Sequence, residues 1–184
     1  YGGTISGNTA TTGNTATTGN TTTQKGGGVC VTDTHSKFNM YGGTITDNTA
    51  TKGGGGVYVS GGTFTMNGNA SVSGNNATNG VSGGVYVVDG TFTMNGGTIS
   101  GNNASSTDGG VGVYTTDAST TATFTMNGGE ITRNKASSQG GGVGVYFAAK
   151  FEMNGGTISG NEVKGNGGGV YMDNKGVHMD GATF

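Results

Sequence analysis

The sequence has 184 residues, of which 43 are glycine, and it contains no proline, no tryptophan and a single cysteine. The formal net charge is −2 and the 8 Lys and Arg residues are scattered, which excludes the basic footprint of a nucleic-acid-binding protein. One cysteine excludes a disulfide within the chain, and no apolar run is long enough to predict a membrane-spanning helix.

One sequence unit recurs along the whole chain. The unit contains "FTM" or a variant of it, and its methionine returns every 26 to 32 residues. The aligned methionines are Met40, Met66, Met94, Met126, Met153 and Met179. A repeat of this length indicates units that cannot bury a core alone and that stack on their neighbours.

Each unit predicts three short strands, because apolar and polar residues alternate in three places. The first strand is "TIS" or similar, centred on Ile5, Ile45, Val72, Ile99, Ile131 and Ile158. The second is "GGVYV" or similar, with Val29, Val57, Val85, Val113, Val145 and Val170 in equivalent places. The third contains Phe38, Phe64, Phe92, Phe124, Phe151 and Val177.

Strands this short are stable only when each one pairs with its equivalent in the next unit. The sequence therefore predicts an all-β fold, a parallel β-helix with three short strands per coil and about six coils. Residues 1–184 would form a single β-helix segment. Neither end carries a helical or charged cap, so we expect this segment to belong to a longer repeat array or to stack end to end.

The first coil is longer than the others because of an insertion between its first two strands. Residues 7–23 repeat a six-residue Thr- and Asn-rich motif in tandem. This polar, low-complexity composition predicts a protruding loop over residues 9–25.

Two columns of asparagine are expected at the bends of the coil. Asparagine tolerates left-handed backbone, and its amide can hydrogen-bond to the amide on the next rung, so a structural role is predicted for both columns. One column contains Asn8, Asn48, Asn75, Asn102, Asn134 and Asn161. The other contains Asn67, Asn95, Asn127 and Asn154, and it ends in Asp180.

Tyrosine alternates with inward-facing valine in the second strand, which predicts a column of outward rings. Its members are Tyr58, Tyr86, Tyr114, Tyr146 and Tyr171. Stacked rings would stabilise the solenoid, and a solvent-exposed aromatic stripe would also bind glycans or a neighbouring rod. We favour plain stacking.

The residues that carry chemistry do not gather in the sequence. The ten acidic residues do not recur in register, His35 and His178 lie in the first and last coils, and Cys30 replaces a tyrosine. We therefore expect no catalytic residues, no metal site and no cofactor.

The unit "I-x-x-N-x-A … G-G-G-V-Y", as in Ile45, Asn48, Ala50 and residues 54–58, resembles the repeats of the polymorphic outer-membrane-protein family. "FTMNGGTISGN" is similar to right-handed parallel β-helix repeats of bacterial surface proteins and autotransporter passengers. The resemblance implies a right-handed coil and an extracellular or cell-surface protein that acts as a structural stalk, fibre or adhesin segment. It departs from the family in using Ile before x-x-N and Val after the glycines.

Two other functions remain open from the sequence. Parallel β-helices also bind or process polysaccharides, so host or matrix glycans are alternative partners beside the chain itself. The paired threonines Thr63/Thr65, Thr91/Thr93 and Thr123/Thr125 resemble the faces of ice-binding solenoids. Lys150 and Glu152 interrupt this array in the following unit.

Overall fold

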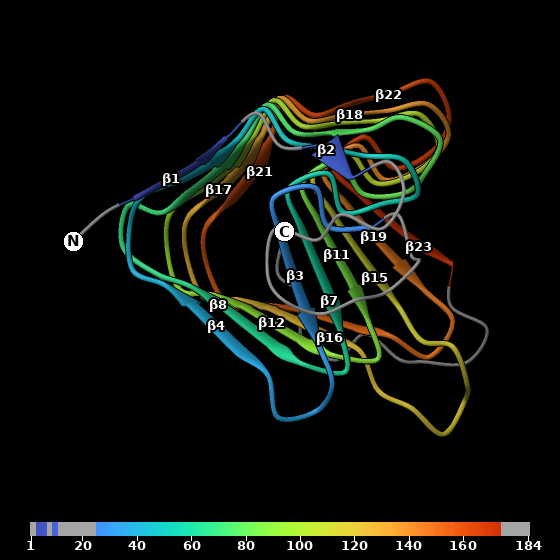
Figure 1. Cartoon of the computed structure of the whole chain (residues 1–184). Coiled ribbons are helices and arrows are strands. Elements are labelled where there is room, and N and C mark those ends of the chain that lie inside the picture. Colours follow the sequence, from blue (N-terminus) through green and yellow to red (C-terminus); the bar gives the residue numbers. More distant parts are fainter. Residues whose placement is uncertain (1–2, 7–8, 11–24, 174–184) are drawn as a thin grey trace.

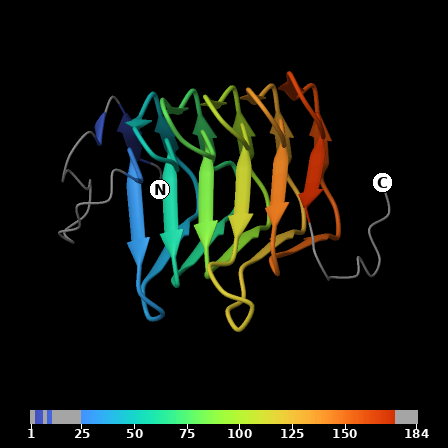
Figure 2. The same ribbon diagram turned by 90° about the vertical axis from the view of Figure 1, so that its right-hand side faces the viewer.

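The structure is a computed structural model that describes residues 3–6, 9–10 and 25–173. These residues form 23 short β-strands and no helix. Viewed along the long axis, the chain passes through four strand positions in each turn, and successive turns lie over one another (Figure 1). The perpendicular view shows the turns as a row of parallel rungs (Figure 2). The chain is therefore a parallel β-solenoid.

The first sheet contains three-residue strands, each with one inward side chain. The strands pair in parallel and in register, so that Ile45 lies beside Val72 and Ile99 lies beside Ile131. In spatial order they are β1 (Thr4–Ser6), β5 (Thr44–Thr46), β9 (Ser71–Ser73), β13 (Thr98–Ser100), β17 (Glu130–Thr132) and β21 (Thr157–Ser159).

The second sheet follows after a sharp bend and consists of two-residue strands. Its inward residue is a small one, such as Ala50 or Ala77, which is fully buried. The strands are β2 (Thr9–Ala10), β6 (Thr49–Ala50), β10 (Asn76–Ala77), β14 (Asn103–Ala104), β18 (Lys135–Ala136) and β22 (Glu162–Val163).

The third and fourth sheets contain four-residue strands, in which alternate side chains such as Phe64 and Met66 face the core. The third sheet contains β3 (Val29–Thr32), β7 (Val57–Ser60), β11 (Val85–Val88), β15 (Val111–Tyr114), β19 (Val143–Tyr146) and β23 (Val170–Asp173). The fourth contains β4 (Lys37–Met40), β8 (Thr63–Met66), β12 (Thr91–Met94), β16 (Thr123–Met126) and β20 (Lys150–Met153).

The core lies inside the four sheets and is built from columns of like side chains. Phe64, Phe92 and Phe124 are fully buried. Their rings stack nearly parallel, with neighbouring centroids 4.9 Å and 4.7 Å apart. Each ring covers the faces of its neighbours, so a few large residues exclude water from a narrow interior.

The glycine runs mark the turn from the second sheet to the third. Gly54 has a φ of +60°, in the left-handed region that glycine adopts without a steric penalty. A Cβ atom on Gly55 would lie 2.5 Å from the carbonyl oxygen of Gly83 on the next rung. The run therefore supplies a left-handed residue first, and then the space that the backbone of the next rung requires.

The predicted all-β parallel β-helix is confirmed, and its three predicted strands are the first, third and fourth sheets. The second sheet was not anticipated, because a two-residue strand is too short to show alternation. The predicted loop 9–25 includes Thr9–Ala10, which form β2, and Lys25, which bridges to Gly53. The rest of that loop, residues 11–24, lies outside the described residues, as do Asn8, Val177, His178, Met179 and Asp180.

Candidate functional site

The tyrosines of the third sheet form a continuous stack of rings on its outer side. Neighbouring centroids lie 5.4, 5.2, 4.3 and 5.6 Å apart along the series Tyr58, Tyr86, Tyr114, Tyr146 and Tyr171. Contacts at these distances between adjacent rungs stabilise the solenoid beyond the burial of the rings themselves. The rings therefore stack as the favoured interpretation expects.

The expectation of a solvent-exposed aromatic stripe is wrong for two of these rings. Tyr58 and Tyr146 are only 6% and 7% exposed, and the other three are half-buried. The segment that leads into the glycine run covers the outer face. Lys25 Nζ lies 4.8 Å from the centroid of the Tyr58 ring and donates a 3.3 Å hydrogen bond to its hydroxyl.

Two of the tyrosines occupy a different ladder position from the others. In β15 and β19 glycine replaces the tyrosine, so that Tyr86 pairs with Gly112 and Gly112 pairs with Gly144. Tyr114 and Tyr146 stand two residues later in their strands, yet their rings continue the stack.

This shift corrects the alignment of the second predicted strand. Val113 and Val145 were expected beside Val85, but Val85 pairs with Val111, and Val111 pairs with Val143. In "VGVY" two valines share the same phase, and alternation alone does not say which of them belongs to the column.

A substitution in the glycine column accounts for the shift. Gly54 and Gly140 have φ values of +60° and +62° at the start of their glycine runs. On the two rungs between them this left-handed position belongs to Ser82 and Asp108, with φ values of +56° and +60°. A residue with a Cβ atom costs about 1–2 kcal/mol there relative to the right-handed region.

The Asp108 side chain fills the space where tyrosine is missing. A Cβ atom on Gly144 would overlap Asp108 Oδ1, and one on Gly112 would overlap Ser82 Oγ and lie 2.5 Å from Asp108 Oδ2. No larger residue fits at either position beside these side chains. The two tyrosines therefore belong two residues further along, where their rings reach back to the carboxylate.

Three neutral hydroxyl groups donate hydrogen bonds to this carboxylate. Oδ2 accepts from the Tyr114 hydroxyl at 2.5 Å and from Thr107 Oγ1 at 3.0 Å, and Oδ1 accepts from the Tyr146 hydroxyl at 2.9 Å. Asp108 is fully buried. Burial raises the pKa of Asp108 to about 7, although the three hydrogen bonds act in the opposite direction.

The same burial affects the hydroxyl groups around the carboxyl. Burial, together with the nearby charge of Asp108, raises the pKa of Tyr114 and of Tyr146 above the ordinary range of tyrosine. Ser82 Oγ is also buried and makes no hydrogen bond to the described part of the chain. Asp108 is itself closed to solvent, so its carboxyl group can bind or release a proton but cannot contact a polymer.

Sequence reasoning missed this cluster because Asp108 was treated as one of ten scattered acids. A signal was present in two coupled departures from the repeat. Ser82 and Asp108 replace glycine in one column, and Gly112 and Gly144 replace tyrosine in another. Each departure alone looks like ordinary variation between repeats.

The buried asparagines form a ladder at the bend between the first and second sheets. Asn48, Asn75, Asn102 and Asn134 are fully buried. The Nδ2 group of each donates to the Oδ1 atom of the next asparagine at 2.9–3.0 Å, and the ladder reaches Asn161.

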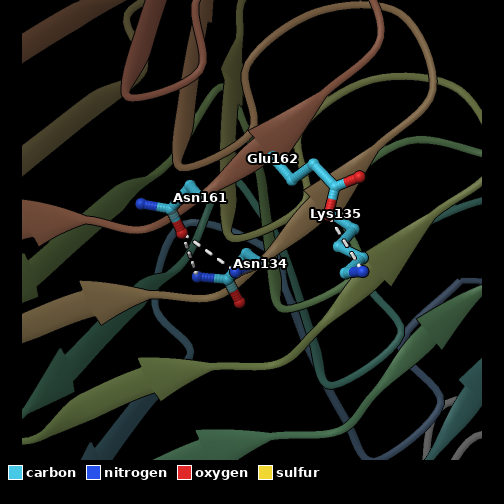
Figure 3. A network of polar contacts seen from close by, with 4 residues as sticks. All are labelled: Asn134, Lys135, Asn161 and Glu162. Carbon is cyan, nitrogen blue, oxygen red and sulfur yellow. Dashed lines mark hydrogen bonds and ion pairs between the residues drawn. The ribbon is translucent and has the colours of Figure 1, made fainter.

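The ladder leaves few polar atoms of these side chains unused. Asn102 Nδ2 donates its second hydrogen to the carbonyl oxygen of Val72 at 3.0 Å. Asn102 Oδ1 accepts two hydrogen bonds from Asn75, one from Nδ2 and one from the backbone amide. Figure 3 shows one step of the ladder, Asn134 to Asn161, beside the ion pair that Lys135 forms with Glu162 at 2.9 Å. The inward asparagines thus join the rungs by amide hydrogen bonds, whereas the next residues, Lys135 and Glu162, form an ion pair that is exposed to solvent.

The second column of asparagines is an outer ladder. Asn95 donates to Asn67, Asn127 donates to Asn95 and Asn154 donates to Asn127, each from Nδ2 to Oδ1 at 2.8–2.9 Å. Asn95, Asn127 and Asn154 are exposed and Asn67 is half-buried. We call these four residues the outer ladder and the series from Asn48 to Asn161 the inner ladder.

A comparison with models of protein families identifies the family of this solenoid. A family model described as a right-handed β-helix region matches residues 4–184. The chain belongs to the right-handed β-helix family. The comparisons with curated proteins and with solved structures found no match.

The outer face of the fourth sheet of this β-helix presents threonine in two in-register columns. Thr63, Thr91 and Thr123 pair along one column, and Thr65, Thr93 and Thr125 pair along the other. Lys37 and Asn39 precede the columns and Lys150 and Glu152 follow them. The face therefore has a neutral centre with charged side chains at both borders.

Two of the described carboxylates of the β-helix, Asp117 and Asp89, accept hydrogen bonds from the loop that follows β15. Backbone and side-chain hydrogen bonds from Ser119 lower the pKa of Asp117. Partial burial raises the pKa of Asp89, but hydrogen bonds from Thr116 and Thr120 outweigh it and leave that pKa below its usual value. Both groups therefore stay ionised at neutral pH, whereas a general acid needs a raised pKa.

Over residues 3–6, 9–10 and 25–173, no group of three or more His, Cys, Asp or Glu side chains has an arrangement suited to a metal ion. No helix of sufficient length and hydropathy to cross a membrane occurs in the same residues. Burial raises the pKa of the Cys30 thiol and outweighs the opposing charge of Lys25, so the thiolate is disfavoured.

Proposed function

We propose that this right-handed β-helix is a non-catalytic structural segment of a stalk, fibre or adhesin outside the cell. The observation that carries the proposal is the unbroken register of like side chains from rung to rung. Phe92 stacks between Phe64 and Phe124, and Asn102 bonds to an asparagine on either side. Each rung is thereby joined to the next by four sheets, a stacked core and an amide ladder, as a rod that carries load requires.

The extracellular location rests on the resemblance of the repeats to polymorphic outer-membrane proteins and autotransporter passengers. A glycine-rich chain with a narrow core also suits an elongated surface structure, in which length matters more than a large interior. No cofactor is part of the proposal.

The proposed partners are further repeats of the same chain or a second copy stacked end to end. Ile158 and Val170 on the last described rung are half-buried, whereas Ile131 and Val143 in the same columns are fully buried. An additional rung would cover these side chains and pair with the backbone groups of β21 and β23.

The absence of catalysis in the proposal is supported by the carboxylates. Asp108 has the raised pKa that acid catalysis needs but is closed to solvent, whereas half-buried Asp89 and exposed Asp117 have lowered pKa values. A glycan-processing β-helix requires both properties in one group.

Labelling of intact cells tests the location and the role together. An antibody raised against the purified chain is applied to cells of the source with and without permeabilisation. We expect surface labelling without permeabilisation, along extended structures that cryo-electron tomography resolves. Labelling that appears only after permeabilisation would overturn the proposal.

A second candidate function is the binding of ice or another ordered surface by the threonine face of the fourth sheet. The two in-register threonine columns favour it, and the side chains of Lys37 and Lys150 at the borders limit the array to three rungs. Thermal hysteresis tests it: activity that Thr93→Lys abolishes and Ser73→Lys, on the first sheet, leaves unchanged would support this function. No hysteresis in the original chain would contradict it.

A further inference from the structure

The two asparagine ladders differ in the residue that follows each asparagine. Every member of the outer ladder precedes a glycine, in Asn67–Gly68, Asn95–Gly96, Asn127–Gly128 and Asn154–Gly155. No described member of the inner ladder does. The residues that follow the inner ladder are Thr49, Asn76, Asn103, Lys135 and Glu162.

We propose that the outer ladder is a site of spontaneous deamidation that accumulates with the age of the protein. The backbone nitrogen of the glycine attacks Cγ of the asparagine, and the bond from Cγ to Nδ2 breaks. Nδ2 leaves as ammonia and a cyclic succinimide remains in the backbone. Water then opens the ring at either carbonyl, which gives aspartate or isoaspartate.

Glycine favours this reaction because it has no Cβ atom to obstruct the approach of its nitrogen and because its backbone is the least restricted. Asparagine is also among the residues that are chemically labile on heating. The amide carbons of Asn95, Asn127 and Asn154 belong to exposed residues, so water reaches both the reacting carbon and the succinimide.

The inner ladder has the same amide chemistry but is protected. Asn75, Asn102 and Asn134 are fully buried, and each Nδ2 group donates two hydrogen bonds, one to an asparagine and one to a carbonyl. Departure of ammonia would break both bonds without compensation from water. The two ladders therefore differ both in their exposure to solvent and in the residue that follows each asparagine.

The position within the outer ladder sets the order of reaction. The amides of Gly128 and Gly155 donate 3.3 Å hydrogen bonds to the carbonyl oxygens of Met94 and Met126. Each bond must open before the nitrogen can attack. The amide of Gly96 donates no such bond within the described residues, so we expect Asn95 to react faster than Asn127 and Asn154.

Deamidation would weaken the contact between rungs. A carboxylate at position 95 has no hydrogen to donate to Asn67 Oδ1, which replaces the 2.9 Å hydrogen bond with a repulsive contact. Two neighbouring carboxylates would also repel one another along the column. Isoaspartate lengthens the backbone at the bend and disturbs the register of the following strand.

Peptide mapping by mass spectrometry tests the proposal. The folded chain is kept at mildly alkaline pH and 37 °C for several weeks, and isoaspartate is quantified with an isoaspartyl methyltransferase. We expect deamidation at Asn95 at least about tenfold faster than at Asn75 or Asn102, which corresponds to about 1.4 kcal/mol in activation free energy. Equal rates in the two ladders, or no modification of the outer ladder, would overturn it.

Two variants separate the contributions of sequence and exposure. Gly96→Ala should slow the reaction at Asn95 and leave Asn127 unchanged. Asn103→Gly places a glycine after buried Asn102, and we expect Asn102 to remain intact because burial protects it. Rapid deamidation at Asn102 in this variant, with circular dichroism showing that the chain is folded, would contradict protection by the fold.

Discussion

The Tyr146 hydroxyl donates a 2.9 Å hydrogen bond to the carboxylate of Asp108, a residue 38 positions earlier in the chain. The bond joins two rungs on the outer side of the third sheet. It depends on two glycines, because a Cβ atom at Gly112 or Gly144 would collide with the carboxylate. One buried acid thus determines the identities of several residues on neighbouring rungs.

The raised pKa of Asp108 predicts that the protein loses stability as the pH rises towards neutrality. Its pKa is about 7 in the folded chain and 3.8 in the reference state. Between these values the folded chain binds more protons than the unfolded chain, so the free energy of unfolding falls with rising pH, by at most about 1.4 kcal/mol per pH unit. Urea unfolding between about pH 5 and pH 8 measures this slope, which should level off above the folded-state pKa.

Asp108→Asn provides the test of this assignment. The variant cannot titrate at position 108, so its stability should be nearly flat over the same range. Asp117→Asn is the control, since Asp117 is exposed and its lowered pKa acts only in more acidic solutions. A slope that is unchanged in Asp108→Asn would show that another group causes it.

Gly144→Ala should be strongly destabilising, by about 2–3 kcal/mol, because the added methyl group overlaps Asp108 Oδ1. Asp108→Gly in the same chain removes the carboxylate and restores glycine to the left-handed position. The double variant should therefore be more stable than the sum of the two single effects predicts. Additive free energies of unfolding in a double-mutant cycle would refute the coupling between these positions.

The inner and outer ladders should differ sharply on truncation. Asn102→Ala removes the buried acceptor of the backbone and side-chain amides of Asn75 and one donor to the carbonyl of Val72, and we expect a loss of about 3 kcal/mol or more. Asn95→Ala removes exposed amide bonds that water replaces, so its cost should stay below about 1 kcal/mol. Guanidinium unfolding of the two variants measures the difference, and similar losses would argue against the inner ladder as the main polar support.

The phenylalanine column should be the most sensitive part of the core. Phe92 is fully buried and stacks on both sides, so Phe92→Ala should cost about 3–5 kcal/mol. Phe92→Leu retains most of the volume and should cost clearly less. If both substitutions cost the same in thermal unfolding, ring stacking rather than volume would dominate this column.

The columns of Phe64, Ile99 and Asn102 could be predicted because each recurs at a fixed place in a repeat whose apolar residues alternate. The second sheet could not, since strands such as Asn76–Ala77 are too short to carry a period. The aligned positions of Val113 and Val145 were wrong because both valines of "VGVY" fit the alternation.

The Asp108 cluster lay beyond the sequence for a different reason. The cluster depends on contacts between rungs about 30 residues apart in the sequence. The Asp108 side chain occupies the volume that is free because glycine replaces tyrosine at Gly112 and Gly144. The exposure of the tyrosines was also hidden, because Lys25 and the segments before the glycine runs cover rings that alternation alone assigns to the outside.

The most direct test of the proposed stalk is cryo-electron microscopy of the native material. We predict a rod in which the rungs continue at about 4.8 Å beyond the described strands β1 and β23 without interruption, through further repeats or a second copy. Isolated particles whose end rungs are covered by other structure would contradict the stalk, and the threonine face of the fourth sheet would then be the surface to examine for a ligand.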